Sequence, residues 1–216
     1  SNKGGVIHFL TRYALSCGVK IGKPYIREDF FPNTVDKYIT FHPTSKPSKT
    51  YDNWQQVLDL LKTPFEANGI RIMQFGANGE KVYKNTIDLV GKTTINQIPY
   101  LIRTSLLHLG ADSFPAHIAS VYNKNIVALY SNNYISCVKP FFGDDKKKIL
   151  LEPNRKTKPV FSFEENPKSI NTIPPEKIAQ SVLDLLNIDY KINVKTVAFG
   201  SHFNNQTLEI IPDGVV

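Results

Sequence analysis

The chain has 216 residues, a length that suits one domain of ordinary size with appendages. Its 41% apolar residues, with 13 Phe and 10 Tyr, are enough for a packed core and argue against a disordered chain. The 26 basic and 19 acidic side chains leave a net charge of +7. That charge favours anionic partners such as nucleotides or sugar phosphates, although it also suits a surface that is merely soluble. Lys and Arg are scattered along the sequence, so nucleic acid is not an expected partner.

The two cysteines, Cys17 and Cys137, allow one disulfide but neither a disulfide framework nor a Cys-based zinc site. A reducing compartment is the simpler expectation, and we expect a cytoplasmic protein. No apolar run approaches a membrane span, and no signal peptide is visible. The chain starts at Ser1 and its single Met is Met73, so we expect a piece of a longer protein.

The first predicted elements are a helix over 6–17, which Gly18 can close, and a Pro-containing linker over 19–37. From residue 38 onward, strands and helices alternate. Short apolar runs predict strands at 38–42, 70–75, 87–90, 106–111 and 126–130. Apolar residues at helical spacing predict helices after Asp52, which could act as the N-cap of the first, around 95–102, and at 115–122.

Residues 131–171 are rich in loop-forming residues, with short strands expected near 148–151 and 158–161 and a solvated loop at 146–148. A last helix is expected to start at Pro174-Pro175, because Pro is favoured in a first helical turn. After Asn187 the pattern becomes strand-like and ends near 208–212. We therefore expect residues 1–37 to be a helix and linker from a preceding domain, 38–188 a Rossmann-like domain, and 189–216 the start of a following element.

This alternation predicts an α/β fold, with a Rossmann-like parallel sheet covered by helices on both faces. Ligands of such sheets bind beyond the carboxyl ends of the strands. The loops expected to carry function are therefore 42–50, 76–80, 90–94 and 111–117. The turn that begins at Gly91-Lys92-Thr93 is not a phosphate-binding P-loop, because Thr86 stands where that motif needs a glycine.

The segment from Leu109 to Ala119 carries the strongest chemical signal. A buried strand ends at Asp112, whose carboxylate could accept a sugar or ribose hydroxyl. A helix then starts near Pro115, and the free N–H groups of a helix start suit a diphosphate. Ser113 could cap that helix and touch phosphate, while His117 lies one turn further on. A plain capped helix with a surface histidine is the alternative interpretation.

The text from Ile39 to Tyr130 resembles the carboxyl-terminal, donor-binding domain of the ADP-heptose:lipopolysaccharide heptosyltransferases, which are glycosyltransferases of family 9 and of the GT-B class. That family has a strand, a Pro-Gly-(Ala/Thr)-(Ser/Thr) loop, a Lys, an aromatic at a helix start, a strand ending in Gly, a Gly-Lys turn and an Asp-(Ser/Thr)-Gly-x-x-His motif. The matching residues here, in the same order, are His42-Pro43-Thr44-Ser45, Lys49, Trp54, Phe75-Gly76, Gly91-Lys92-Thr93-Thr94 and Asp112-Ser113-Phe114-Pro115-Ala116-His117.

The resemblance implies a role for each matching residue. The donor, a nucleotide-diphosphate sugar, would be held at its phosphates and its sugar hydroxyls, and the nucleotide would lie along the strand ends. The residues expected to bind it are Thr44, Ser45 and Lys49 at the phosphates, Gly76 where the chain passes close to the nucleotide, Thr93 beside the base, Asp112 at donor hydroxyls, and Ser113 and His117 at phosphate. Three departures stand out, because the family keeps glycine where this chain has Ser45, Phe114 and Ser131.

The resemblance also implies an inverting, metal-independent transfer with no cofactor. The general base would come from an amino-terminal domain that also holds the sugar or glycan acceptor, so the isolated chain is expected to be inactive. A non-catalytic binding or structural module with the same fold is the main alternative. A sugar-nucleotide epimerase is a further one, but the acidic catalytic set it would need is not found. A domain with a Gly-rich first loop and a nearby Asp ahead of Ser1 would favour the enzyme.

Overall fold

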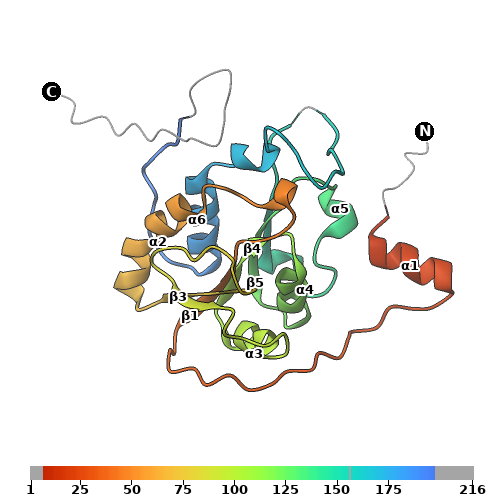
Figure 1. Cartoon of the computed structure of the whole chain (residues 1–216), viewed down its shortest axis with the longest axis horizontal. Coiled ribbons are helices and arrows are strands. Elements are labelled where there is room, and N and C mark those ends of the chain that lie inside the picture. Colours follow the sequence, from red (N-terminus) through yellow and green to blue (C-terminus); the bar gives the residue numbers. More distant parts are fainter. Residues whose placement is uncertain (1–6, 156, 198–216) are drawn as a thin grey trace.

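The structure, a computed structural model, describes residues 7–155 and 157–197 (Figure 1). Within those residues, six parallel strands form a single sheet. All five strands predicted between residues 38 and 130 are present, and so is the strand near 148–151. The strands are β1 (Tyr38–His42), β2 (Arg71–Gly76), β3 (Ile87–Val90), β4 (Leu107–Ala111), β5 (Asn125–Leu129) and β6 (Lys148–Leu151).

The strands are ordered β3-β2-β1-β4-β5-β6. β2 and β3 are therefore added on one side of β1, and β4, β5 and β6 are added on the other side. Every residue of β1 and β4 is buried, as expected for central strands covered on both faces. Phe41 is paired with Leu109 where the two halves meet. The boundary between β1 and β4 is therefore the topological switch point of the sheet, the place where ligands of such sheets bind.

Two helices cover each face of the sheet (Figure 1). The face formed by residues such as Phe41, Leu109 and Val127 packs against α2 (Trp54–Asn68) and α6 (Pro175–Leu185). The other face packs against α3 (Gln97–Thr104) and α4 (Phe114–Val121). The predicted α/β fold with helices on both faces is confirmed.

Helix α2 buries the predicted side chains Trp54, Val57, Leu58 and Leu61, and Gly69 closes it in the left-handed conformation at φ +66°. The predicted cap is wrong. Asn53 occupies the cap position without a side-chain bond, whereas the carboxylate of Asp52 accepts hydrogen bonds from Lys168 Nζ at 2.6 Å and Asn171 Nδ2 at 2.7 Å. Asp52 is held by tertiary contacts to a distant segment.

Helix α1 (Phe9–Cys17) ends at Gly18, as predicted, and none of its residues is buried. His8 Nε2 lies 2.8 Å from the carbonyl oxygen of Lys139, which holds the start of the helix to the main body. The segment over 19–37 has no regular structure and runs past α3 toward β1 (Figure 1). Glu28 holds this segment against α3 and the end of α4, because its carboxylate accepts hydrogen bonds from Arg103 Nε at 2.9 Å and from the hydroxyl of Tyr122 at 3.0 Å.

Two predictions for the region after β5 are wrong. Residues 158–161 form no strand, because this segment bonds to loops instead: Ser48 N donates to the carbonyl of Phe163 at 3.1 Å, and Phe161 N donates to that of Asn132. The side chain of Lys148 is only 3% exposed and lies 2.9 Å from Asp145, so the lysine run is not fully solvated. The strand-like text at 208–212 lies outside the described residues.

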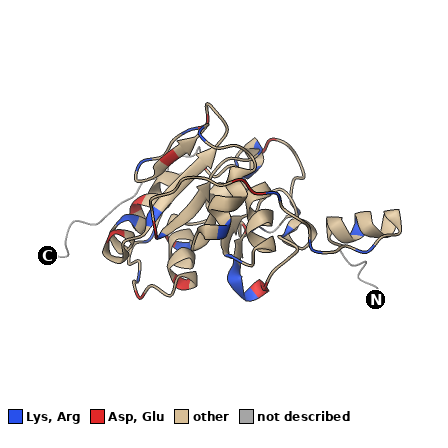
Figure 2. Ribbon diagram, turned by 90° about the horizontal axis from the view of Figure 1, so that it is seen from below, with Lys and Arg blue, Asp and Glu red and all other residues tan. Residues whose placement is uncertain are grey.

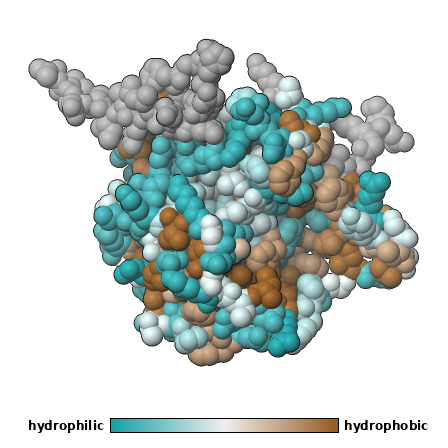
Figure 3. Space-filling view, viewed as in Figure 1, coloured by the Kyte–Doolittle hydropathy of each residue, from teal (hydrophilic) through white to brown (hydrophobic). Residues whose placement is uncertain are grey.

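Lys and Arg are spread over the described part of the fold (Figure 2), and exposed apolar side chains occur in several separate patches (Figure 3). One group belongs to α1 and its flanks. Cys17 and Cys137 are both free thiols. Within the described ranges, no helix combines the length and the apolar character needed to cross a bilayer.

Candidate functional site

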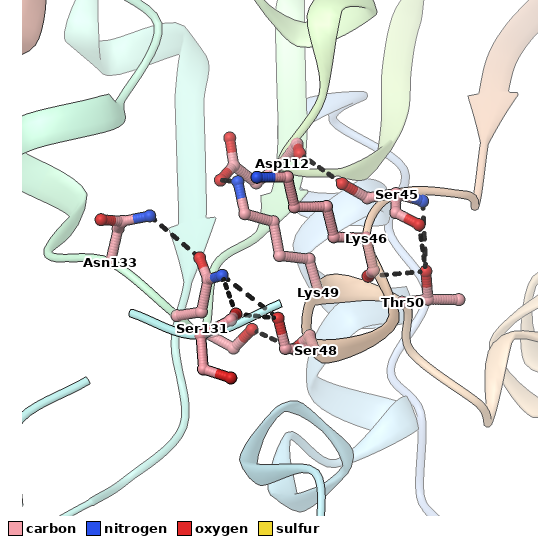
Figure 4. Close-up of polar contacts among 10 residues, drawn as sticks. Ser45, Lys46, Ser48, Lys49, Thr50, Asp112, Ser131 and Asn133 are labelled. Atoms are coloured by element: carbon pink, nitrogen blue, oxygen red, sulfur yellow. Dashed lines mark hydrogen bonds and ion pairs between the residues drawn. The ribbon is translucent and has the colours of Figure 1, made fainter. Parts of the chain in front are cut away.

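The loops that follow β1 and β4 contact each other at the switch point of the sheet. Lys49 Nζ lies 2.5 Å from Asp112 Oδ2, and the hydroxyl of Ser45 donates to the backbone carbonyl of Asp112 at 2.9 Å. Figure 4 shows these side chains converging, with Lys46 extending in the same direction as Lys49. Three residues that the sequence placed in one site, from segments more than 60 residues apart, therefore meet.

The loop after β1 is held by hydrogen bonds within the loop and by hydrogen bonds to residues after β5. The Thr50 hydroxyl accepts from Ser45 N at 3.1 Å and lies 3.0 Å from the Ser45 carbonyl oxygen, which closes the loop around the 3₁₀ helix η1 (Pro47–Lys49). Ser48 is fully buried, and its carbonyl accepts from Ser131 Oγ at 2.6 Å while its hydroxyl accepts from Asn132 Nδ2 at 3.1 Å (Figure 4). This bracing fixes the direction in which Lys49 leaves the loop.

The Lys49–Asp112 pair is shielded from solvent, with side chains 15% and 6% exposed. An ion pair in such surroundings is screened much less than one on the surface. The Lys49 ammonium carries three N–H donors, so a phosphate oxygen could bind it while Asp112 remains bound. Asp112 also has a second carboxylate oxygen that can accept a ligand hydroxyl. The pair can thus hold an anion and a hydroxyl side by side.

Ser113 is the first residue before α4, but it does not cap the helix as the sequence predicted. Its side chain makes no cap bond; instead Ser113 Oγ lies 3.0 Å from Nδ1 of His42, the last residue of β1. The helix start also offers few free N–H groups, because Pro115 has none and Ala116 N donates to the carbonyl of Ser113 at 3.2 Å. An anion here would depend on side chains more than on the helix backbone.

His117 lies one turn into α4, where it lines an apolar pocket together with Leu10, Pro24 and Phe141. Burial lowers the pKa of the His117 imidazole, while the nearby charge of Asp112 opposes that shift and Lys49 adds to it. The imidazole is therefore neutral at neutral pH and can donate or accept a hydrogen bond. The charges of Asp112, His8 and Lys49 all act on this ring, but no hydrogen bond joins it to the Lys49–Asp112 pair among the described residues.

Gly76 ends β2, and the space where its side chain would be is taken by Glu80. A Cβ at position 76 would collide with Glu80 Oε2. That oxygen is buried and has no hydrogen-bond partner among the described residues, and it lies 4.0 Å from His42 Nε2. A buried carboxylate oxygen without a donor is unfavourable, so it is a ready acceptor for a ligand hydroxyl. A side chain at position 76 would therefore displace the end of the Glu80 side chain.

The remaining predicted residues lie at the same edge of the sheet but outside this cluster. Thr44 is half-buried in the loop between His42 and Ser45, and its side chain makes no hydrogen bond within the described parts. Thr93 follows β3, two strands away from β1, with a buried hydroxyl that has no partner in the described structure. Nothing links Thr93 to the Lys49–Asp112 pair.

The sequence interpretation missed His42 and Glu80 as site residues, and it did not consider Lys46. The sequence held one indication for His42 and one for Glu80, because each lies at or just after the end of a predicted strand. His42 ends a buried strand, and Glu80 follows the turn from Gly76 to Gly79 at the end of the next one. Their meeting depends on β1 and β2 being neighbours, which the sequence alone does not specify. Over residues 7–155 and 157–197, no three His, Cys, Asp or Glu side chains gather as a metal site would require.

Comparison with known proteins adds a family and a fold. The sequence profile described as glycosyltransferase family 9 (heptosyltransferase) matches residues 19–168. No curated protein matches the chain. A similar solved structure is ADP-heptose lipopolysaccharide heptosyltransferase II of E. coli, with a TM-score of 0.56, 16% identity, and coverage of 87% of this chain and 52% of that one.

Two further solved structures are similar. A family 9 glycosyltransferase from Veillonella parvula has a TM-score of 0.57 and 20% identity, over 82% of this chain and 50% of that one. The dodecameric iron-containing heptosyltransferase TibC, in complex with ADP-D-beta-D-heptose, has a TM-score of 0.58 and 13% identity, over 79% and 50%. The chain spans about half the length of these structures, and identities this low establish a shared fold only.

Proposed function

The chain belongs to glycosyltransferase family 9, the heptosyltransferase family, and we propose that it binds the nucleotide-diphosphate-sugar donor of an inverting glycosyl transfer. Residues 38–188 would form the donor-binding domain. The observation that carries this proposal is the Lys49–Asp112 pair, which brings a cation and a hydroxyl acceptor together at the switch point of the sheet.

The chemistry of the transfer matches the charges and hydrogen-bonding groups at this switch point. The oxygen of an acceptor hydroxyl attacks the anomeric carbon of the donor sugar, and a general base takes the hydroxyl proton. The bond from that carbon to the diphosphate oxygen breaks, and the diphosphate leaves with the electron pair. Lys49, which is shielded from solvent, would offset the charge that develops on the leaving diphosphate, and the exposed Lys46 extends beside it.

Ser113 and His117 would add hydrogen bonds to the phosphates, and the second oxygen of Asp112 would accept a hydroxyl of the donor. Two cationic side chains supply the counter-charge that a divalent metal would otherwise provide, so we propose that binding is metal-independent. Because the chain spans about half the length of the solved heptosyltransferases, we propose that another domain holds the acceptor and supplies the general base.

One observation favours the alternative of a non-catalytic module with the same fold. Phe114 stands where the family keeps glycine, and its side chain is 40% exposed at the start of α4. Pro115 has no N–H, and the Phe114 ring stands at the helix start, so phosphate finds fewer accessible backbone donors here than in an ordinary first turn. A module of this kind would recognise a nucleotide sugar without contributing to turnover.

Calorimetry on the 216-residue chain with ADP, UDP, GDP and inorganic pyrophosphate tests the proposal. We expect weak binding of at least one nucleoside diphosphate, because half of a cleft forfeits part of the contact that a closed cleft provides. Binding should be unchanged by EDTA. A folded chain that binds none of these ligands contradicts the proposed function, and sugar transfer by this chain alone contradicts the placement of the general base elsewhere.

A further inference from the structure

The imidazole of His42 lies between two groups of the candidate site that belong to different strands. Its Nδ1 is 3.0 Å from the Ser113 hydroxyl, and its Nε2 is 4.0 Å from Glu80 Oε2. The ring stacks on Phe75, with centroids 5.5 Å apart and planes 20° apart, and meets Phe114 edge-on at 6.0 Å. His42 is only 7% exposed. Packing therefore fixes the ring in one orientation.

We propose that His42 is a positioning residue: its Nδ1 directs the Ser113 hydroxyl toward a phosphate, and its Nε2 edge, beside Glu80, completes a seat for a ligand hydroxyl. This inference rests on the proposed binding of a nucleotide-diphosphate donor. It adds that one side chain couples recognition of the phosphate with recognition of the hydroxyl-bearing part of the same ligand.

The contact with Ser113 has a required direction once phosphate is bound. Phosphate oxygens only accept hydrogen bonds, so the Ser113 hydroxyl must donate its single proton to the ligand. The hydroxyl can then only accept from His42, which means that Nδ1 must carry the proton. Without that donor, the Ser113 hydroxyl would be free to turn toward other acceptors and would be less well prepared for phosphate.

The contact with Glu80 follows from the same protonation state. In a neutral ring with the proton on Nδ1, Nε2 is an acceptor. Nε2 and Glu80 Oε2 then form two acceptors 4.0 Å apart, and Oε2 has no donor within the described residues. Two neighbouring acceptors suit a ligand that presents neighbouring hydroxyls, such as the ribose of a nucleotide. Of the other side chains around the ring, Phe75 and Phe114 are apolar, and His108 on β4 is the further titratable group.

Two substitutions separate the contacts, because the Asn amide occupies the position of Nδ1 and the Gln amide that of Nε2. His42→Asn should bind pyrophosphate within about threefold of the wild type, and His42→Gln should bind it about tenfold more weakly. The preference for ADP over 2′,3′-dideoxy-ADP should be retained in His42→Gln and reduced about tenfold in His42→Asn. Ile72→Val is the control, since it trims a buried side chain of β2 that packs on the opposite face of the sheet; it should lower the melting temperature and leave that preference unchanged.

A measurement on the wild type does not depend on the folding of any variant. Nitrogen-15 NMR of the His42 ring should show the proton on Nδ1 when pyrophosphate is added. An unprotonated Nδ1 in the complex overturns the inference, as do His42→Asn and His42→Gln variants that both bind like the wild type or lose both ligands equally. A folded wild type that binds neither pyrophosphate nor ADP overturns the proposed function itself, and with it this inference.

Discussion

The ammonium of Lys49 and the carboxylate of Asp112 lie 2.5 Å apart and join the loop after β1 to the end of β4. The resemblance to heptosyltransferases assigns the first to phosphate and the second to donor hydroxyls, yet in the structure each is the other's partner. A ligand must therefore share this pair or open it. The affinity of the site for a diphosphate depends on both residues together.

The pair can be tested by removing one charge and then both. Lys49→Met should weaken ADP binding about tenfold to a hundredfold, because it removes a charge-assisted contact worth about 1.5–3 kcal/mol. It should also lower the free energy of unfolding by about 1–3 kcal/mol, since it leaves Asp112 nearly buried and unpaired. Lys49→Met/Asp112→Asn should recover stability but not affinity. Calorimetry and urea unfolding measure the two effects; recovery of affinity in the double variant would contradict a role for Lys49 in binding.

Gly76→Ala should act through Glu80. The added Cβ meets the far end of a flexible side chain, so the free energy of unfolding should change by no more than about 1 kcal/mol. ADP affinity should fall by the same factor as in Glu80→Ala, and the double variant should show no further loss. Gly22→Ala is the control, because a Cβ there meets nothing within 4 Å. Additive losses in the double variant would show that Gly76 acts independently of Glu80.

His108 should make stability depend on pH. The ring is fully buried on β4, and burial lowers its pKa from 6.5 to about 3, with the charge of His42 adding to the shift. Above pH 6.5 neither the folded nor the unfolded state binds the proton, so the stability is complete. Between pH 6.5 and 3 only the unfolded state binds it, so stability falls by about 1.4 kcal/mol per pH unit.

The Thr40 hydroxyl lies 3.1 Å from His108 Nδ1, and His108→Asn keeps an amide near it. This variant should be less stable than the wild type, and its stability should fall by about 1.4 kcal/mol per pH unit less steeply between pH 6.5 and 3. Urea unfolding at several pH values between 4 and 6, for wild type and variant, measures the difference. His117 is common to both proteins, so its contribution cancels, and His42→Asn in both backgrounds removes the contribution of His42, whose charge acts on His108. Parallel pH profiles would mean that His108 does not stay neutral in the folded protein.

Phe114→Gly restores the residue typical of the family at the start of α4. Removing the ring should expose the helix start and strengthen pyrophosphate binding. It should also destabilise the protein by about 1 kcal/mol or more, because glycine is unfavourable in a helix and the contact with His42 is lost. Phe114→Ala separates the ring from the backbone effect. Weaker pyrophosphate binding in both variants would indicate that the ring itself contacts the ligand.

The sequence predicted the elements whose signal is local. The apolar runs of β1 and β4 and the spacing of Trp54, Val57 and Leu61 need no knowledge of neighbours. Features decided by distant partners were predicted poorly. Asp52 resembles a cap, but its partners are Lys168 and Asn171, 116 and 119 residues away.

The candidate site shows the same division. Lys49 and Asp112 stand in recognisable loops, and the order of elements already placed those loops at one edge of the sheet. Their direct pairing was not predicted, because each side chain was assigned to the ligand. The contacts of His42 with Ser113 and Glu80 depend on which strands are neighbours and on the rotamers packed between them. No local pattern carries that information.

The strand order also governs how the chain can assemble. Every strand pairing in the described sheet is parallel, so no hairpin can form early and hold two strands together. The central pairing is among the most demanding, since Thr40 on β1 meets His108 on β4 after 68 intervening steps along the chain. Closing so long a loop costs entropy before any contact repays it, which makes folding slow. Until β4 arrives, one edge of β1 has unpaired backbone groups, and the incomplete sheet is open to association with other chains.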